Sequence, residues 1–318
     1  MTLREALDQY VAHRRATGVV FDSGAAVLGT FCHSLGPQTP CAEISSASVC
    51  AFINGRGTPT RYWQRKRSVL AGFYAYATSR GLASPVALPA QTPVLAPPLV
   101  PYIYSRGEVR SLLLAADSYR PRHASVPAEA LRTLVLLLYA TGLRVGEALA
   151  LRLREVDLAG AVLTVRRAKF HKMRLVPLGP DLVRELEAYR SARCAAFPPR
   201  DDEAAFLADS QGRPLCYKNV GNAFRRVRQA VGLLRTDGAH YQPRLHDLRA
   251  SFATERLTEC YRRGGDVQRL LPLLSTYLGH ASVAETEPYL AHTPALLGQA
   301  GLQFERHVCA AQGGCHAK

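Results

Sequence analysis

The sequence has little of what secreted, membrane-spanning or zinc-binding proteins need. Its eight cysteines form no Cys-x-x-Cys pair, so the spacing of a zinc ribbon is missing. No apolar run approaches the about 18 residues that suggest a membrane span, and the first residues lack the apolar core of a signal peptide. We therefore expect a cytoplasmic protein with reduced thiols and no membrane partner.

Acidic residues are also scarce. The 318 residues include 25 Asp and Glu against 40 Lys and Arg, which gives a formal net charge of +15. The positive electrostatic field of this charge concentrates phosphates near the protein and speeds association with nucleic acid, without conferring sequence preference. Most of the basic residues are Arg, whose planar guanidinium binds phosphate oxygens through paired hydrogen bonds. The charge favours a nucleic-acid partner, although charge alone also fits an ordinary basic enzyme.

Two familiar devices for phosphate chemistry are missing from the sequence: a phosphate-binding glycine loop and a carboxylate cluster spaced for a metal. The second half instead contains six residues that suit a metal-free reaction on a phosphodiester. They are Arg144, Lys169, His246, Arg249, His280 and Tyr289. The cations can hold the phosphate by its charge, and the phenolic oxygen can attack it. We therefore expect neither a metal nor another cofactor.

Four separated strings carry these residues. Arg144 lies in TGLRVGEAL, Lys169 in AKFHKMRLVPL, and His246 and Arg249 in HDLR, while Tyr289 follows the histidine of LGH by nine residues. In type, order and spacing the strings resemble the tyrosine recombinase (phage integrase) family. The resemblance covers about residues 105 to 300, and agreement of all four strings by chance is remote.

The resemblance implies a mainly α protein with a small antiparallel β-sheet, an α+β fold. It also implies that a helical core-binding domain precedes an integrase-like catalytic domain. The predicted divisions are a helical DNA-binding domain over 1–84, a proline-rich linker over 85–104, a catalytic domain over 105–303 and a C-terminal tail over 304–318.

Local signals predict how Arg144 and Lys169 are held. Thr141-Gly142 ends an apolar helix, because glycine tolerates the left-handed conformation that closes a helix, and Arg144 then falls in a tight turn between two helices. Two apolar stretches, 163–165 and 175–178, flank a basic tip and predict a β-hairpin that carries Lys169. Both residues are thus expected on short connections between regular elements.

A third signal concerns His246 and Arg249. They are three residues apart, so one helical face presents both. Pro243 predicts that this helix starts there, which would add the positive end of its dipole at a bound phosphate.

The resemblance implies a role for each residue. Tyr289 is the nucleophile that forms a 3′-phosphotyrosyl link, and Lys169 protonates the departing 5′ oxygen, with Lys172 as its rival. Arg144 and Arg249, with His246, hold the non-bridging oxygens of the phosphate. His280 donates a hydrogen bond to the phosphate, and Glu147 braces Arg144 or His246.

Two basic bands predict contacts with the DNA backbone. They consist of Arg61, Arg65 and Lys66 in the first domain and Arg225, Arg226 and Arg228 in the second. A basic helix face can lie against a groove of the duplex. The alternative interpretation is a charged face that is merely solvated.

The predicted function is that of a site-specific DNA recombinase or integrase, which exchanges strands between two double-stranded sites as a tetramer. The setting predicted for it is a bacterial mobile element that undergoes transposition, with the protein on the nucleoid and with accessory recombinases as candidate partners. Two alternatives stay open. One is a type IB-like DNA topoisomerase, which shares the chemistry, and the other is a non-catalytic DNA-binding protein derived from a recombinase.

Overall fold

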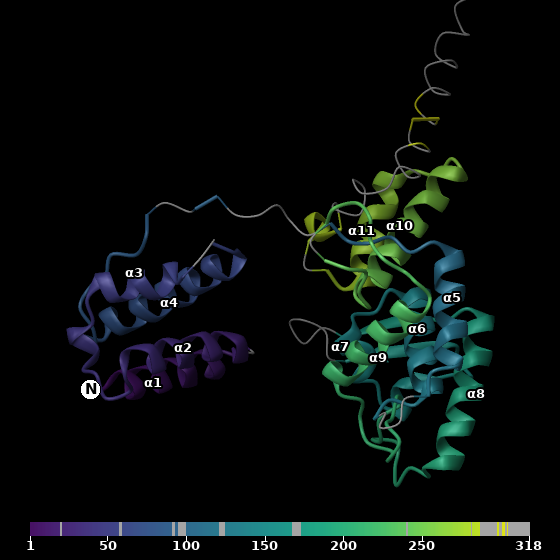
Figure 1. The fold of residues 1–318 in the computed structure, drawn as a ribbon, viewed down its shortest axis with the longest axis horizontal. Helices are drawn as coiled ribbons and strands as arrows, with labels where there is room; N and C mark the ends of the chain where they lie inside the picture. Colours follow the sequence, from purple (N-terminus) through teal and green to yellow (C-terminus); the bar gives the residue numbers. More distant parts are fainter. Residues whose placement is uncertain are drawn as a thin grey trace, which may run out of the picture. The chain divides into compact units, whose positions relative to one another are not determined.

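A computed structural model gives the fold in two compact units, Met1–Pro98 and Leu99–Lys318, each with its own hydrophobic core (Figure 1). The division falls inside the proline-rich stretch 85–104. The structure describes residues 1–318 except 20, 57–58, 91–92, 95–99, 121–124, 167–172, 240, 281, 287–297, 299–300, 303 and 305–318. The predicted general acid Lys169, its rival Lys172 and the predicted nucleophile Tyr289 lie outside the described residues.

In the described part of the first unit, four helices pack their apolar faces together. They are α1 (Leu3–Ala16), α2 (Asp22–Leu35), α3 (Ser46–Asn54) and α4 (Arg61–Ser79), with a 3-10 turn η1 (Cys41–Glu43) between α2 and α3. Leu70, Phe73 and Ala77 recur at helical spacing on α4 and are fully buried, as their spacing predicts. In the described part of the chain, no helix is both long and apolar enough to cross a membrane.

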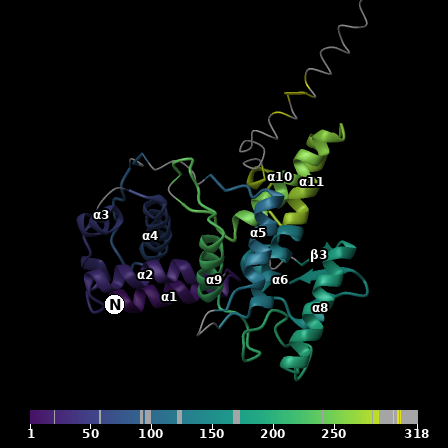
Figure 2. The ribbon, with the colours of Figure 1, turned by 45° about the vertical axis from the view of Figure 1, so that its right-hand side comes forward.

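The second unit is also mainly helical. Its helices are α5 (Arg106–Asp117), α6 (Ala128–Thr141), α7 (Val145–Leu149), α8 (Pro180–Ala196), α9 (Tyr217–Ala230), α10 (Asp247–Arg262) and α11 (Val267–Leu278), with 3-10 turns η2 (Leu153–Glu155) and η4 (Val283–Glu285). Helix α6 is buried along most of its length and contacts α5, α7, α8, α9 and α10 (Figure 2). Helix α6 is therefore the central helix of the second unit.

A three-stranded antiparallel sheet accompanies these helices. Its strands are β1 (Val156–Asp157), β2 (Val162–Val165) and β3 (Arg174–Pro177), in the order β1-β2-β3. Val162 pairs with Pro177 and Val165 with Arg174, so β2 and β3 form the predicted hairpin. A mainly α fold with a small antiparallel sheet is confirmed, whereas the short strand β1 was not predicted.

The turn that holds Arg144 has the predicted form. Helix α6 ends at Thr141, and Gly142 follows with a φ of +64° in the left-handed region. A Cβ at Gly142 would lie 2.5 Å from the ring of Phe252 on α10, so this position requires glycine for its conformation and for its packing. Arg144 is then the residue immediately before α7.

The predicted start of the later helix at Pro243 is wrong. Helix α10 begins at Asp247, with His246 as its N-cap residue. The reason is a turn closed by Asp247, whose carboxylate accepts from the Arg244 amide at 2.9 Å and whose own amide donates to the Arg244 carbonyl at 3.0 Å. Arg249 therefore lies in the first turn of α10, three residues after His246.

Candidate active site

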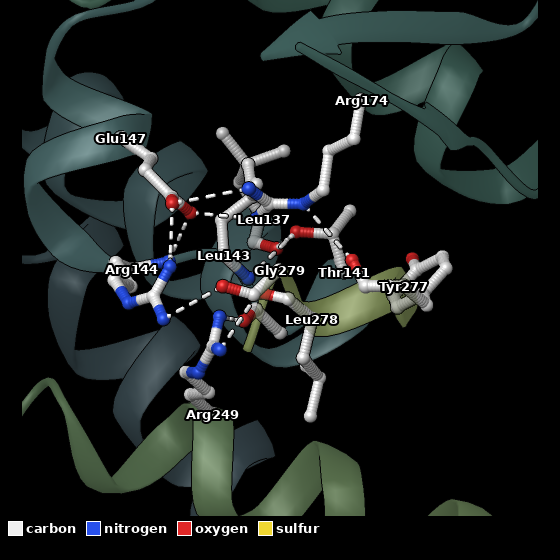
Figure 3. Close-up of polar contacts among 11 residues, drawn as sticks. Leu137, Thr141, Leu143, Arg144, Glu147, Arg174, Arg249, Tyr277, Leu278 and Gly279 are labelled. Carbon is white, nitrogen blue, oxygen red and sulfur yellow. Dashed lines mark hydrogen bonds and ion pairs between the residues drawn. The ribbon is translucent and has the colours of Figure 1, made fainter. Parts of the chain in front are cut away.

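Arg144 is fixed on two sides by the elements around it (Figure 3). One terminal nitrogen donates to Glu147 Oε1 at 2.9 Å, and the other donates to the carbonyl of Gly279 at 3.1 Å. Its backbone amide donates to Glu147 Oε2 at 3.0 Å. Of the two partners predicted for Glu147, the structure gives it Arg144. The Arg144 side chain is still 27% exposed, so protein does not enclose it completely.

Arg249 joins the ends of two helices. Its two terminal nitrogens donate to the carbonyl of Gly142 at 2.7 Å and to the carbonyl of Leu278 at 2.8 Å. These carbonyls follow α6 and end α11, where helices leave acceptors without intrahelical partners. Arg249 is 2% exposed, so in this conformation its guanidinium is enclosed by protein.

A third arginine, Arg174 at the start of β3, belongs to the same cluster and was not predicted as a site residue. It donates to Glu147 and to the carbonyl of Tyr277 (Figure 3). Three guanidinium groups therefore meet at the C-terminal end of α11, whose carbonyls carry partial negative charge. The sequence signal was its position in AKFHKMRLVPL, five residues after Lys169.

The two histidines lie next to these cations. His280 follows Gly279, and its Nδ1 is 2.7 Å from the hydroxyl oxygen of the fully buried Thr286. Burial, and then the charges of Arg249 and Arg144, lower the pKa of His280 to about 4. Although part of His246 reaches solvent, the surrounding protein and then Arg249 lower its pKa as well. Both imidazoles are therefore neutral at pH 7, where they can hydrogen-bond an oxygen without adding charge.

These shifts predict how stability depends on pH. A histidine whose pKa is lower in the folded state than in the unfolded state takes up its proton first in the unfolded chain. Its contribution to stability is therefore complete above about pH 6.5 and falls as the pH drops toward about 4 for His280. In His280→Gln, the free energy of urea unfolding should decrease less between about pH 7 and about pH 5 than in the wild type.

The exposed His33 of α2 provides the control. His33→Gln should keep the pH dependence of the wild type. Equal slopes in the wild type and in His280→Gln would contradict the assignment of this pH dependence to His280.

The predicted basic band of the first unit is partly used within that unit. Arg61 and Arg65 are exposed on α4, and Arg65 donates to the hydroxyl of Ser23. Lys66 is half-buried and donates to the carbonyl of Phe52 at 2.6 Å, with its ammonium over the Phe52 ring. Burial lowers the pKa of Lys66. Arg61 and Arg65 are thus more accessible to a ligand than Lys66.

The second basic band divides between two faces of α9. Arg225 and Arg226 are exposed, but Arg228 is buried and donates to the carbonyl of Pro243 at 2.7 Å. Arg228 lies four residues after the buried Phe224, and residues four apart share a helical face. Arg228 therefore supports the segment that leads to His246, and we do not propose a DNA contact for it.

The chain matches known proteins over nearly its whole length. The profile of the phage integrase family matches residues 106–295. A putative integrase/recombinase, y4rB of Sinorhizobium fredii, is 33% identical over 312 residues, which cover 96% of this chain and 98% of the relative. Tyrosine recombinase XerC of Lactobacillus delbrueckii subsp. bulgaricus is 27% identical over 302 residues, covering 91% and 94%.

Solved structures share the fold at lower identity. The Tn1549 transposon integrase, solved in complex with transposon right-end DNA, gives a TM-score of 0.63 at 15% identity, covering 96% of this chain and 99% of that one. A lambda integrase tetramer bound to a Holliday junction gives a TM-score of 0.60 at 19% identity, covering 91% of this chain and 77% of that one.

Proposed function

Because the chain belongs to the phage integrase family of tyrosine recombinases, we propose that it breaks and rejoins double-stranded DNA at specific sites through Tyr289. The observation that supports this most is the cluster of Arg144, Arg249 and His280, which distant segments bring to the end of α11. Its charge and its neutral imidazole suit a phosphodiester, which brings negative oxygens and needs hydrogen-bond donors.

The proposed reaction is a transesterification. The phenolic oxygen of Tyr289 bonds to the scissile phosphorus as the bond to the 5′ oxygen breaks. The phenolic proton passes to solvent water, and the leaving oxygen gains a proton from Lys169. The products are a 3′-phosphotyrosyl link and a free 5′-hydroxyl, so the energy of the phosphodiester is retained for rejoining. Attack adds negative charge to the non-bridging oxygens, which Arg144 would stabilise by direct contact and the enclosed Arg249 by its charge.

Recombination, and not relaxation of supercoils, is the reaction we propose. The relatives that match the chain over nearly its whole length are named integrases or recombinases. Incubation with two target duplexes should give strand exchange between them. Relaxation of a supercoiled plasmid without exchange would instead indicate a type IB-like topoisomerase, and binding without cleavage would indicate a non-catalytic DNA-binding protein.

Cleavage should not need a divalent metal ion. In the proposed site the guanidinium groups neutralise the phosphate, which is the task that a metal performs in many phosphoryl-transfer enzymes. We expect covalent complex to form at the same rate with an excess of chelator as with magnesium, as measured by denaturing electrophoresis of labelled DNA. A strict magnesium requirement of the cleavage step would contradict the mechanism.

We further propose that DNA contacts come from both units, with Arg61 and Arg65 in the first and Arg225 and Arg226 in the second. Their exposure on α4 and α9 supports this assignment. The setting we propose is a bacterial mobile element, with the protein acting in the cytoplasm on the nucleoid. The fold shared with a transposon integrase supports that setting.

Strand exchange between two duplexes needs four active sites, so we propose a tetramer on DNA. A groove of about 1580 Å³ between α6, α8, α10 and α11 supports this, since it exceeds the about 300–1,000 Å³ of small-molecule sites and suits a peptide segment. Leu136, Leu270 and Leu274 are among its apolar lining residues. The occupant that we propose is the C-terminal segment 296–308 of a neighbouring copy, in which Leu302 and Phe304 are exposed.

Removal of this segment gives a prediction that separates assembly from DNA binding. Head-to-tail docking can close a ring of subunits, so removal of the segment should disrupt the ring without disrupting one subunit. Deletion from Gly298 onward should spare binding to a single site, measured by gel shift, but abolish recombination between two sites. Full recombination by the truncated protein would show that the segment does not join the subunits.

A further inference from the structure

The guanidinium of Arg174 on β3 donates hydrogen bonds to residues of two other elements. Its Nε donates to the carbonyl of Tyr277 at 2.9 Å, and its two terminal nitrogens donate to Glu147 at 3.1 and 2.7 Å (Figure 3). The side chain is 11% exposed. One side chain therefore connects three elements, β3, α7 and α11.

Arg144 is held by the same carboxylate and by another carbonyl at the same end of α11. Glu147 Oε1 accepts from both arginines, and the carbonyl of Gly279, two residues beyond Tyr277, accepts from Arg144. Arg174 therefore fixes both supports of Arg144, the carboxylate and the end of α11. Of the two arginines, Arg144 is the more exposed, at 27% against 11%, so it is the one that a phosphate can reach.

From these contacts we propose that Arg174 is a positioning residue, which serves as counter-ion to Glu147 and so leaves the charge of Arg144 to the DNA phosphate. The proposal rests on the proposed function of the site. The formal charges of Arg144, Arg174 and Glu147 sum to +1, but without Arg174 they would sum to zero. Arg144 would then be neutralised by its own brace.

The state of Glu147 agrees with this assignment. Burial raises the pKa of this carboxyl, but hydrogen bonds and charge from Arg174, together with the bonds from Arg144, outweigh burial and lower it overall. A buried carboxylate needs a partner to stay ionised, and a bidentate arginine is the strongest that side chains provide. Glu147 is thus ionised while Arg144 is still partly exposed.

Gly279 gives independent support. It ends α11 with a φ of +69°, and a Cβ there would lie 2.8 Å from a terminal nitrogen of Arg174 and 3.1 Å from its central carbon. This glycine therefore closes the helix and also makes room for the Arg174 guanidinium against the backbone. A larger residue would displace Arg174 from the end of α11.

The test compares Arg174→Gln, Arg174→Lys and the double variant Glu147→Gln/Arg174→Gln. The substrate is a nicked duplex built on the site recovered from covalent complexes of the wild type. Arg174→Gln should cleave about 10²-fold more slowly, the size of effect expected when one preorganised charge is lost from a phosphate site. The double variant should cleave at least about tenfold faster than Arg174→Gln, because the charge of Arg144 is no longer neutralised by Glu147. The cleavage rate of Arg174→Lys should lie between those of the wild type and Arg174→Gln, since lysine supplies charge without the bidentate geometry.

Sulfur at the bridging 5′ position should not rescue Arg174→Gln, because Arg174 acts through the non-bridging oxygens. Rescue would place Arg174 with the general acid instead and overturn the proposal. Cleavage by Arg174→Gln within about threefold of the wild type would overturn it too, as would a double variant no faster than Arg174→Gln.

Hydrogen exchange tests the positioning without DNA. In Arg174→Gln the amides of Arg144 and His280, which donate to Glu147 and to Ser275, should exchange faster than in the wild type. Arg193→Gln is the matched control, because Arg193 is also buried and donates to the carbonyls of Phe197 and Ala205. Unchanged exchange in Arg174→Gln would overturn the proposal, whereas a wild type that forms no covalent complex would refute only the proposed function.

Discussion

Tyr289→Phe is expected to bind DNA with the affinity of the wild type and to form no covalent complex at all. The substitution removes one oxygen, which in the proposed reaction is the atom that bonds to phosphorus. Tyrosine is weakly nucleophilic near pH 7, so the surrounding cations are needed for attack, but they cannot replace the oxygen itself. Denaturing electrophoresis of labelled nicked duplex measures the complex, and a gel shift measures binding.

Tyr217→Phe is the matched control, since Tyr217 is an exposed tyrosine at the start of α9. It should form covalent complex at the wild-type rate. Covalent complex in Tyr289→Phe would refute the assignment of the nucleophile, because another residue would then have to carry the link.

Arg144→Ala is expected to lower the rate of cleavage by about 10³-fold, the loss found when a preorganised donor to a developing anion is removed. The protein should still fold, because Arg174 remains as a bidentate partner of Glu147 and no buried carboxylate is left unpaired. Single-turnover cleavage measures the rate, and circular dichroism with thermal unfolding checks the fold.

A bridging 5′ sulfur separates Arg144 from Lys169. A thiolate leaves without a proton donor, so Lys169→Ala should regain a near-normal rate on the sulfur substrate. Arg144→Ala should stay slow, since its charge acts on the non-bridging oxygens, and Lys172→Ala should behave like the wild type on both substrates. Rescue of Lys172→Ala and not of Lys169→Ala would exchange the roles of the two lysines.

Local signals in the sequence predicted the framework of the site well. Gly142 ends α6 as its type and position indicate. The hairpin of β2 and β3 follows from two short apolar stretches around a basic tip. Each of these features depends on residues within a few positions of one another, which a single sequence displays directly.

Contacts between distant segments could not be predicted in the same way. The sequence indicates only that Arg174 is a polar residue of a strand. Its role depends on a hydrogen bond to the carbonyl of Tyr277, 103 residues later. Arg228 reads as part of a basic band, but its carbonyl partner on Pro243 is known only from the fold. The start of α10 at Asp247 was missed for a local reason, since Pro243 favours a helix start and the turn that Asp247 closes with Arg244 was overlooked.

In the proposed reaction, Tyr289 carries DNA by its 3′ phosphate without a metal ion. The most direct measurement is mass spectrometry of the wild-type covalent complex, formed with excess chelator and then digested by protease and nuclease. We expect one modified peptide, with the nucleotide 3′-linked to the phenolic oxygen of Tyr289. A nucleotide on another residue, a 5′ linkage, or complex formed only with added metal would contradict it.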